Sequence, residues 1–144
     1  MVNIMKQIIF FLTLFAAPVT VAQADQTDPR LDAYFDALYQ TEDVIERQIL
    51  ENQIWSAWRS VEQPAVDEAF TLGMDAMQSS DYKAAIEQFT QAIELNPDFA
   101  EAYNMRATTH FLMGNNFESL TDVQVTIDLE PRHFGALMGG AQIA

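Results

Sequence analysis

The sequence predicts an all-α fold of stacked antiparallel helical hairpins. Apolar residues recur at helical spacing through most of the chain, and no stretch alternates apolar and polar residues for long enough to indicate a strand. Two segments also correspond to each other: Ala-Ile-Glu-Leu-Asn-Pro at 92–97 and Thr-Ile-Asp-Leu-Glu-Pro at 126–131. A fixed period of roughly 34 residues is typical of hairpins that stack because none of them can bury its apolar face alone.

Positions 1–24 have the layout of a secretory signal peptide. They contain one cation, Lys6, no acid, an apolar run over 8–19, and the small-residue pattern Ala22-Gln23-Ala24. The run is shorter than the roughly 20 apolar residues of a spanning helix, and Pro18 interrupts it. We therefore expect cleavage after Ala24 and a periplasmic or secreted mature protein without a membrane span. The alternative is an uncleaved anchor.

The composition excludes several classes of function. The chain has 7 Lys and Arg residues against 21 Asp and Glu residues, a formal charge of −14, and loss of Lys6 with the segment 1–24 gives 6 − 21 = −15. Nucleic acids bind mainly through cations that meet phosphates, so no nucleic acid is expected as a partner. We interpret the acidity as a solubilising surface, with an acidic binding surface as the alternative. Because the chain has no cysteine, disulfides, thiolate nucleophiles and lipid attachment are excluded.

Residues 25–63 predict a helical hairpin ahead of the repeats. Asp28-Pro29 is typical of a helix start, and Leu31, Phe35 and Leu38 follow at helical spacing. Thr41 is expected to cap a second helix over 42–59. The apolar stripe of that helix comprises Val44, Ile45, Ile49, Ile54, Trp55 and Trp58, and we expect its two tryptophans to lie in the core. We interpret this hairpin as a degenerate repeat that forms the N-terminal cap.

Residues 64–144 are expected to form five further helices. Turn-forming residues interrupt the helical pattern at 79–81, 96–97, 114–116 and 130–131. Asp98 with Glu101, and Asn115 with Glu118, have the spacing of capping boxes. The expected helices are 64–77, 82–95, 98–113, 117–130 and a last helix that begins at 134.

The segment 66–99 resembles the tetratricopeptide repeat family. Its first helix carries the close-packing pair Leu72 and Gly73. The residues that match the turn and the second helix are Tyr82, Ala85, Phe89, Ala92 and Pro97. Gly73 and Ala85 are small, so the two helices can approach closely, while Tyr82 and Phe89 fill the gap to the next hairpin. The resemblance implies a short right-handed superhelix.

Two later segments resemble the same family less closely. In the second unit, 100–133, the matching residues include Tyr103, Ala107, Gly114 and Pro131, whereas Ser119, Val123 and Thr126 depart from the pattern. The segment 134–144 resembles the opening of a truncated third unit. It is apolar, although solenoids normally end in a polar capping helix. Three explanations stay open: this segment covers the second unit adequately, another chain completes the face, or the array is incomplete.

Catalytic and metal-binding chemistry is not expected. General acid–base and nucleophilic catalysis need a base beside a nucleophile, and His110 and His133 are the only histidines. His110 stands where the repeat packs an aromatic residue, and we expect His133 to be exposed in an inter-repeat loop. The sequence lacks the spacings of common hydrolase, nucleotide and metal motifs. Acids such as Asp122 and Asp128 are interpreted as solvated helix faces, so no enzyme activity, metal or cofactor is expected.

The resemblance implies a binding scaffold whose first helices line a concave groove. Position by position, the groove side comprises Phe70, Met74, Met77, Asn104, Met105, Thr108, Phe111 and Met138. Methionine and phenylalanine form an adaptable apolar surface, although a methionine stripe is also typical of a core. Arg106 is the only cation in the second groove helix, so a cluster that clamps a carboxylate is not expected.

The sequence therefore predicts a non-catalytic protein–protein interaction scaffold of the bacterial cell envelope, with an unidentified protein or peptide as partner. The alternative is a structural protein that forms homo-oligomers through its open C-terminal face. A small enzyme or metal binder that uses the two histidines is a distant third hypothesis.

Overall fold

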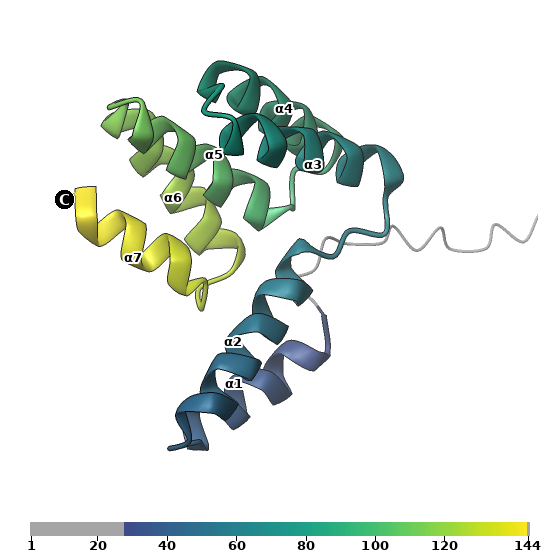
Figure 1. Ribbon diagram of the computed structural model, residues 1–144, viewed down its shortest axis with the longest axis vertical. Coiled ribbons are helices and arrows are strands. Elements are labelled where there is room, and N and C mark those ends of the chain that lie inside the picture. The colour runs from purple at the N-terminus through teal and green to yellow at the C-terminus, as the bar shows by residue number, and fades with distance from the viewer. Residues whose placement is uncertain (1–27, 144) are drawn as a thin grey trace, which may run out of the picture.

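The computed structural model describes residues 28–143, which are helical with no strand among them. The signal-peptide prediction for 1–24 lies outside these residues. Figure 1 shows two stacked hairpins, α3–α4 and α5–α6, with α7 beside them and the α1–α2 hairpin projecting from one side. The all-α prediction is confirmed. The helices are α1 (Arg30–Gln40), α2 (Val44–Arg59), α3 (Pro64–Gln78), α4 (Tyr82–Leu95), α5 (Ala100–Leu112), α6 (Asn116–Leu129) and α7 (Phe134–Ile143).

The first repeat packs α3 against α4 through a glycine and an aromatic ring. A Cβ atom added to Gly73 would lie 2.6 Å from Cε1 of Phe89, so only glycine allows the ring to sit there. Ala85, Phe89 and Ala92 are fully buried, and Tyr82 is half-buried. The expectation for Leu72 is wrong, because this side chain is 48% exposed on the outer side of α3.

The second repeat packs α5 against α6 with polar groups in the contact. Ala107 and Ser119 are buried, and the Ser119 hydroxyl donates to the Ala107 carbonyl at 2.8 Å. Gly114 ends the turn after α5 with a φ of 79°, a conformation that favours glycine. Tyr103 is half-buried beneath the Arg106 guanidinium, 5.6 Å from its ring centroid. Pro97 and Pro131 are exposed and follow the ends of α4 and α6.

Two predicted helix starts are corrected by the structure. α2 is capped by Asp43 rather than Thr41, because the Asp43 carboxylate accepts from the backbone N–H groups of Ile45 and Glu46 at 2.7 and 3.1 Å. α5 begins at Ala100, and Glu101 does not complete a capping box, because its carboxylate is buried against other elements. Local spacing could not reveal those contacts of Glu101, because they come from elements far away in the sequence.

The α1–α2 hairpin is not stacked on the first repeat as a cap. The Cα atoms of α2 come within 8 Å of α5 but of neither α3 nor α4. The C-terminal half of the α2 stripe is buried as expected at Ile54 and Trp58, whereas Ile45 and Ile49 in its first turns are exposed. The turn between α1 and α2 points away from the other helices (Figure 1).

Candidate binding groove

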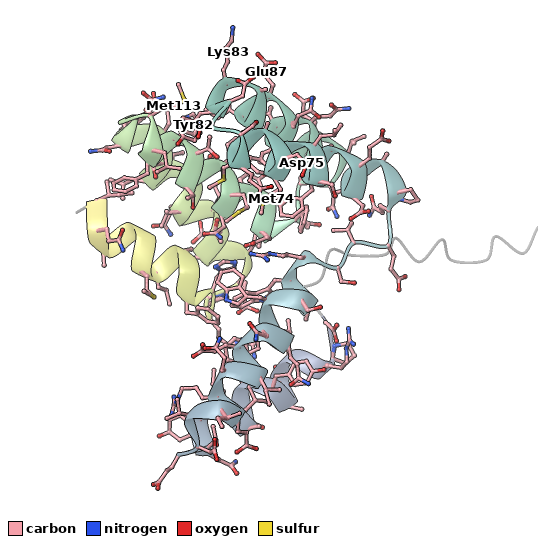
Figure 2. All side chains as sticks on the ribbon, in the orientation of Figure 1. Met74, Asp75, Tyr82, Lys83, Glu87 and Met113 are labelled. Atoms are coloured by element: carbon pink, nitrogen blue, oxygen red, sulfur yellow. The ribbon has the colours of Figure 1, made fainter. Side chains whose placement is uncertain are left out.

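The expected groove residues of the first repeat belong largely to its core. Phe70 is only 5% exposed and packs between the rings of Phe89 and Phe99, with centroids 5.7 and 4.9 Å away. It is therefore not a groove residue. Met74 and Met77 are half-buried against the same core, as is Met105 of α5. Figure 2 shows Met74 on the side of α3 toward α5, whereas Lys83 and Glu87 extend from α4 away from the groove.

A small hollow of about 80 Å³ lies between α5 and α7, with α6 beneath it. Asn104, Thr108 and Phe111 contribute from α5, as the sequence predicted. Met138 is 63% exposed on α7 and is not among the lining residues. The remaining lining residues are Ala107, Ser119, Val123, Gly135, Gly139, Gln142 and Ile143.

The lining of this hollow is uncharged and has one open side. A Cβ atom added to Gly139 would have no neighbouring atom within 4 Å, so the described chain leaves space beside this glycine. Asn104 is 4% exposed and is held by donation from its Nδ2 to Glu101 Oε2 at 2.9 Å. Thr108 and Phe111 reach the surface more fully. We call the surface formed by Asn104, Thr108, Phe111 and Gly139 the α5–α7 groove.

A buried polar cluster lies next to this groove and is linked to it through Asn104. The Glu101 carboxylate accepts from Arg59 Nε of α2 at 3.2 Å and from Asn104 of α5. It also lies 3.0 Å from Nε2 of His133, and both side chains are fully buried. The prediction that His133 is exposed is therefore wrong. We call Arg59, Glu101 and His133 the polar joint, because they link α2, α5 and the start of α7.

The hydrogen-bond pattern assigns the tautomer of His133. The backbone N–H of Ala136 donates to Nδ1 at 3.2 Å, so Nδ1 carries no proton. The proton on Nε2 is then donated to Glu101. His133 thereby satisfies an N–H of the first turn of α7 that has no partner within the helix. One imidazole ring thus fixes both the start of α7 and the inner end of α5.

The two tryptophans of α2 dock the hairpin onto this joint. The Trp58 ring stacks on His133 with centroids 4.2 Å apart and planes at 13°. Trp55 packs edge-on against Phe134. Its ring also lies so close to Gly135 that a Cβ atom on this residue would come within 2.7 Å of it. The prediction that both tryptophans are core residues holds for Trp58, which is buried, while Trp55 is half-buried at the end of the groove.

Arg106 is committed to a structural ion pair. Its guanidinium donates from Nε and Nη2 to the two Asp122 oxygens at 2.8 Å each, and from Nη1 to Thr90 Oγ1 at 3.0 Å. The hydrogen bonds with Asp122 raise the pKa of Arg106 above its ordinary value. Asp122 is buried, which corrects the expectation of a solvated acid. The Arg106 guanidinium is therefore occupied by Asp122 within the fold, and Arg106 is not among the residues that line the groove.

Residues 28–143 hold neither a metal-binding cluster nor a membrane-spanning helix. No group of three His, Asp or Glu side chains in this range is placed to hold a metal ion. None of the helices in the same range is long and apolar enough to cross a membrane. His110 is half-buried, and its Nδ1 lies 3.5 Å from the Asn115 amide.

Comparisons with known proteins identify the repeats. A family model described as TPR repeat matches residues 76–114. A TPR repeat-containing protein of Rhizobium etli is 31% identical over 149 aligned residues, which cover 96% of this chain and 73% of that protein. A protein SGT1 homolog of Bos taurus is 35% identical over 74 residues, 51% of this chain and 22% of that protein. Hsp70-Hsp90 organizing protein 2 of Arabidopsis thaliana is 34% identical over 65 residues, 45% of this chain and 11% of that protein.

Local sequence patterns do not indicate the residues that join α2, α5 and α7. Glu101 has the spacing of a capping residue, and His133 follows a proline in a turn, so neither position indicated burial. The helical spacing of 42–59 places Arg59 and Trp55 in a separate hairpin.

Proposed function

Because the chain belongs to the tetratricopeptide repeat family, we propose that it is a non-catalytic scaffold of the bacterial cell envelope that binds a partner segment in the α5–α7 groove. Stacked helical repeats of this kind present extended concave surfaces to other proteins. The observation that carries the proposal is the uncharged, open-sided hollow beside Thr108 and Phe111. The partner segment presents apolar side chains, because no lining residue offers a charge.

The polar joint limits what the groove can accept. Glu101 is buried and accepts a hydrogen bond from Asn104 of the lining, so this pair of polar groups is already satisfied within the fold. Arg106 is held by Asp122, and no cation lies among the lining residues. A ligand that depends on recognition of a terminal carboxylate is therefore disfavoured.

Affinity capture from a cell-envelope extract tests the groove. We compare the protein with Thr108→Glu/Phe111→Glu, which places two charges in the groove, and with Thr121→Glu/Phe117→Glu. The second pair is matched in residue type and lies exposed on α6. Proteins bound through the groove are retained by the α6 control and reduced at least tenfold by the groove variant. Equal recovery with both variants would contradict the proposal.

The envelope location rests on the segment 1–24 and is tested separately. Lys6, the apolar run over 8–19 and the pattern Ala22-Gln23-Ala24 support export and cleavage after Ala24. N-terminal sequencing of protein purified from its host, after cell fractionation, should give Asp25 as the first residue in the envelope or culture fraction. A chain that starts at Met1 in the cytosol would contradict export.

Self-association through α7 is the second candidate function. α7 carries no charged residue, and Leu137 and Met138 are 47% and 63% exposed on it. A second copy that covered this face would remove their apolar surface from water. Light scattering at micromolar concentration distinguishes the candidates: a dimer that Leu137→Ser/Met138→Ser converts to a monomer favours self-association, and a monomeric wild type rejects it.

A further inference from the structure

The outer side of α2 forms a second surface without a partner in the described chain. Ile45, Ile49, Asn52 and Ser56 follow one another at helical spacing and are all exposed. Ile45 and Ile49 are 73% and 53% exposed, although both are fully apolar. The opposite side of α2 is the one that packs against α1, through Ile54, Ala57 and Trp58. We call Ile45, Ile49, Asn52 and Ser56 the outer α2 face.

A hollow continues the outer α2 face toward the rest of the molecule. It has a volume of about 550 Å³ and is lined by Asn52, Trp55, Ser56, Arg59 and Ser60. From Ile45 to Ser56 the helix rises about 16 Å, at about 1.5 Å per residue. This length and the straight helical spacing suit one partner helix that lies along α2 and ends in the hollow.

The charges around the apolar end of this face favour a cationic partner. Glu42, Asp43 and Glu46 are exposed beside Ile45 and Ile49, and Arg47 is the only cation in these first turns. The guanidinium of Arg47 donates to the Thr41 carbonyl at 3.0 Å. An anionic lipid surface would be repelled by the same acids, because such surfaces attract basic segments.

A second copy of the chain fits this face poorly. In an antiparallel twofold pairing of α2 helices along the whole outer α2 face, Ile45 would meet Ser56, so that apolar surface would be buried against polar groups. A parallel pairing would bring Glu42, Asp43 and Glu46 together with their own copies. Two exposed isoleucines also expose far less than the roughly 800 Å² per partner of a stable dimer.

We propose that the outer α2 face is a second docking site, distinct from the α5–α7 groove, for a cationic amphipathic helix of a partner protein. The apolar side of that helix covers Ile45 and Ile49, and its lysines or arginines pair with Glu42 and Glu46. The polar joint holds the α1–α2 hairpin against α5 and α7, so the two docking sites keep a fixed relation. The protein then joins two partners rather than binding one.

Fluorescence polarisation with a labelled synthetic peptide tests this proposal. The probe is a 15-residue amphipathic helix with leucines on one face and lysines on the other, and its control replaces every lysine with glutamate. We expect the lysine peptide to bind the protein at least tenfold more tightly than the glutamate peptide. The double variant Ile45→Ser/Ile49→Ser should weaken binding of the lysine peptide at least tenfold.

Control variants locate the binding and separate it from the groove. Leu72→Ser/Leu95→Ser removes two other apolar side chains of similar exposure, and Thr108→Glu/Phe111→Glu alters the groove. Both should change the peptide affinity by less than twofold. Equal losses in these variants, or no loss in Ile45→Ser/Ile49→Ser, would overturn the proposal.

Two further results would also overturn it in favour of another occupant. One is a wild-type dimer in light scattering that Ile45→Ser/Ile49→Ser converts to a monomer. The other is binding to phosphatidylcholine vesicles containing phosphatidylglycerol that the same variant abolishes.

Circular dichroism should give the same melting temperature for the Ile45→Ser/Ile49→Ser variant as for the wild type within about 3 °C, since both side chains are exposed.

Discussion

The two repeats reach the same close packing by different means. In the first repeat a ring fills the space left by a glycine: Phe89 lies over Gly73, and Ala85 and Ala92 are fully buried around it. In the second repeat a buried serine donates to a carbonyl, and a buried aspartate holds an arginine. The first contact depends on shape, and the second depends on satisfied polar groups. A further buried polar group of the second repeat, Glu101, accepts from Arg59 and so links this repeat to the α1–α2 hairpin.

The largest expected effect is the loss of the ring in the first repeat. Phe89→Ala leaves a cavity beside Gly73 and should lower the free energy of unfolding by about 3–5 kcal/mol. Chemical denaturation measures it. Phe117→Ala is the matched control, because Phe117 is 80% exposed, and it should change stability by less than about 0.5 kcal/mol. Similar effects of the two variants would contradict the packing of the first repeat.

The polar joint is expected to be the next most sensitive point. Glu101→Gln removes a buried charge that accepts from Arg59, Asn104 and His133, and should cost about 2–3 kcal/mol. Both tryptophans pack against His133 of this joint, so their fluorescence should shift to longer wavelength as the hairpin loosens. Glu118→Gln, on an exposed carboxylate, should change neither quantity. An unshifted emission spectrum in Glu101→Gln would show that the hairpin does not depend on the joint.

A smaller effect separates shape from hydrogen bonding in the second repeat. Ser119→Ala keeps the α5–α6 contact close but removes the donor to the Ala107 carbonyl, and should cost about 1 kcal/mol. Gly73→Ala in the first repeat should cost more, about 1–3 kcal/mol, because its new methyl group meets the Phe89 ring. The reverse order in thermal or chemical unfolding would contradict the comparison of the two repeats.

The smallest effect concerns acid and the start of α1. Hydrogen bonds from Arg30 hold the pKa of Asp28 below its ordinary value of 3.8. A lowered folded-state pKa means that the contribution to stability is present at neutral pH and is lost as the pH falls below about 4. Asp28→Asn should therefore destabilise the protein by about 0.5–1 kcal/mol at pH 7 and by less at pH 3. A larger difference in unfolding free energy between the wild type and Asp28→Asn at pH 3 than at pH 7 would contradict this prediction.

The sequence was informative where packing depends on local spacing. The period between Pro97 and Pro131 and the small residues Gly73 and Ala85 predicted the hairpins and most helix ends. Helical spacing wrongly places Phe70 on the groove side, because Phe99 from the turn between α4 and α5 packs against it. The joint between Glu101 and His133 joins residues 32 positions apart, and no local pattern indicates which polar groups will meet at that distance.

Photocross-linking tests the central claim, that the α5–α7 groove binds a partner, most directly. Benzoylphenylalanine replaces either Phe111 in the groove or Phe117 on the exposed side of α6, and intact cells that express each protein are irradiated. Both positions are exposed aromatic residues, so the substitution is mild at each. The account predicts a discrete cross-linked protein from position 111 and none from position 117. A partner captured from position 117 alone, or equally from both, would contradict it.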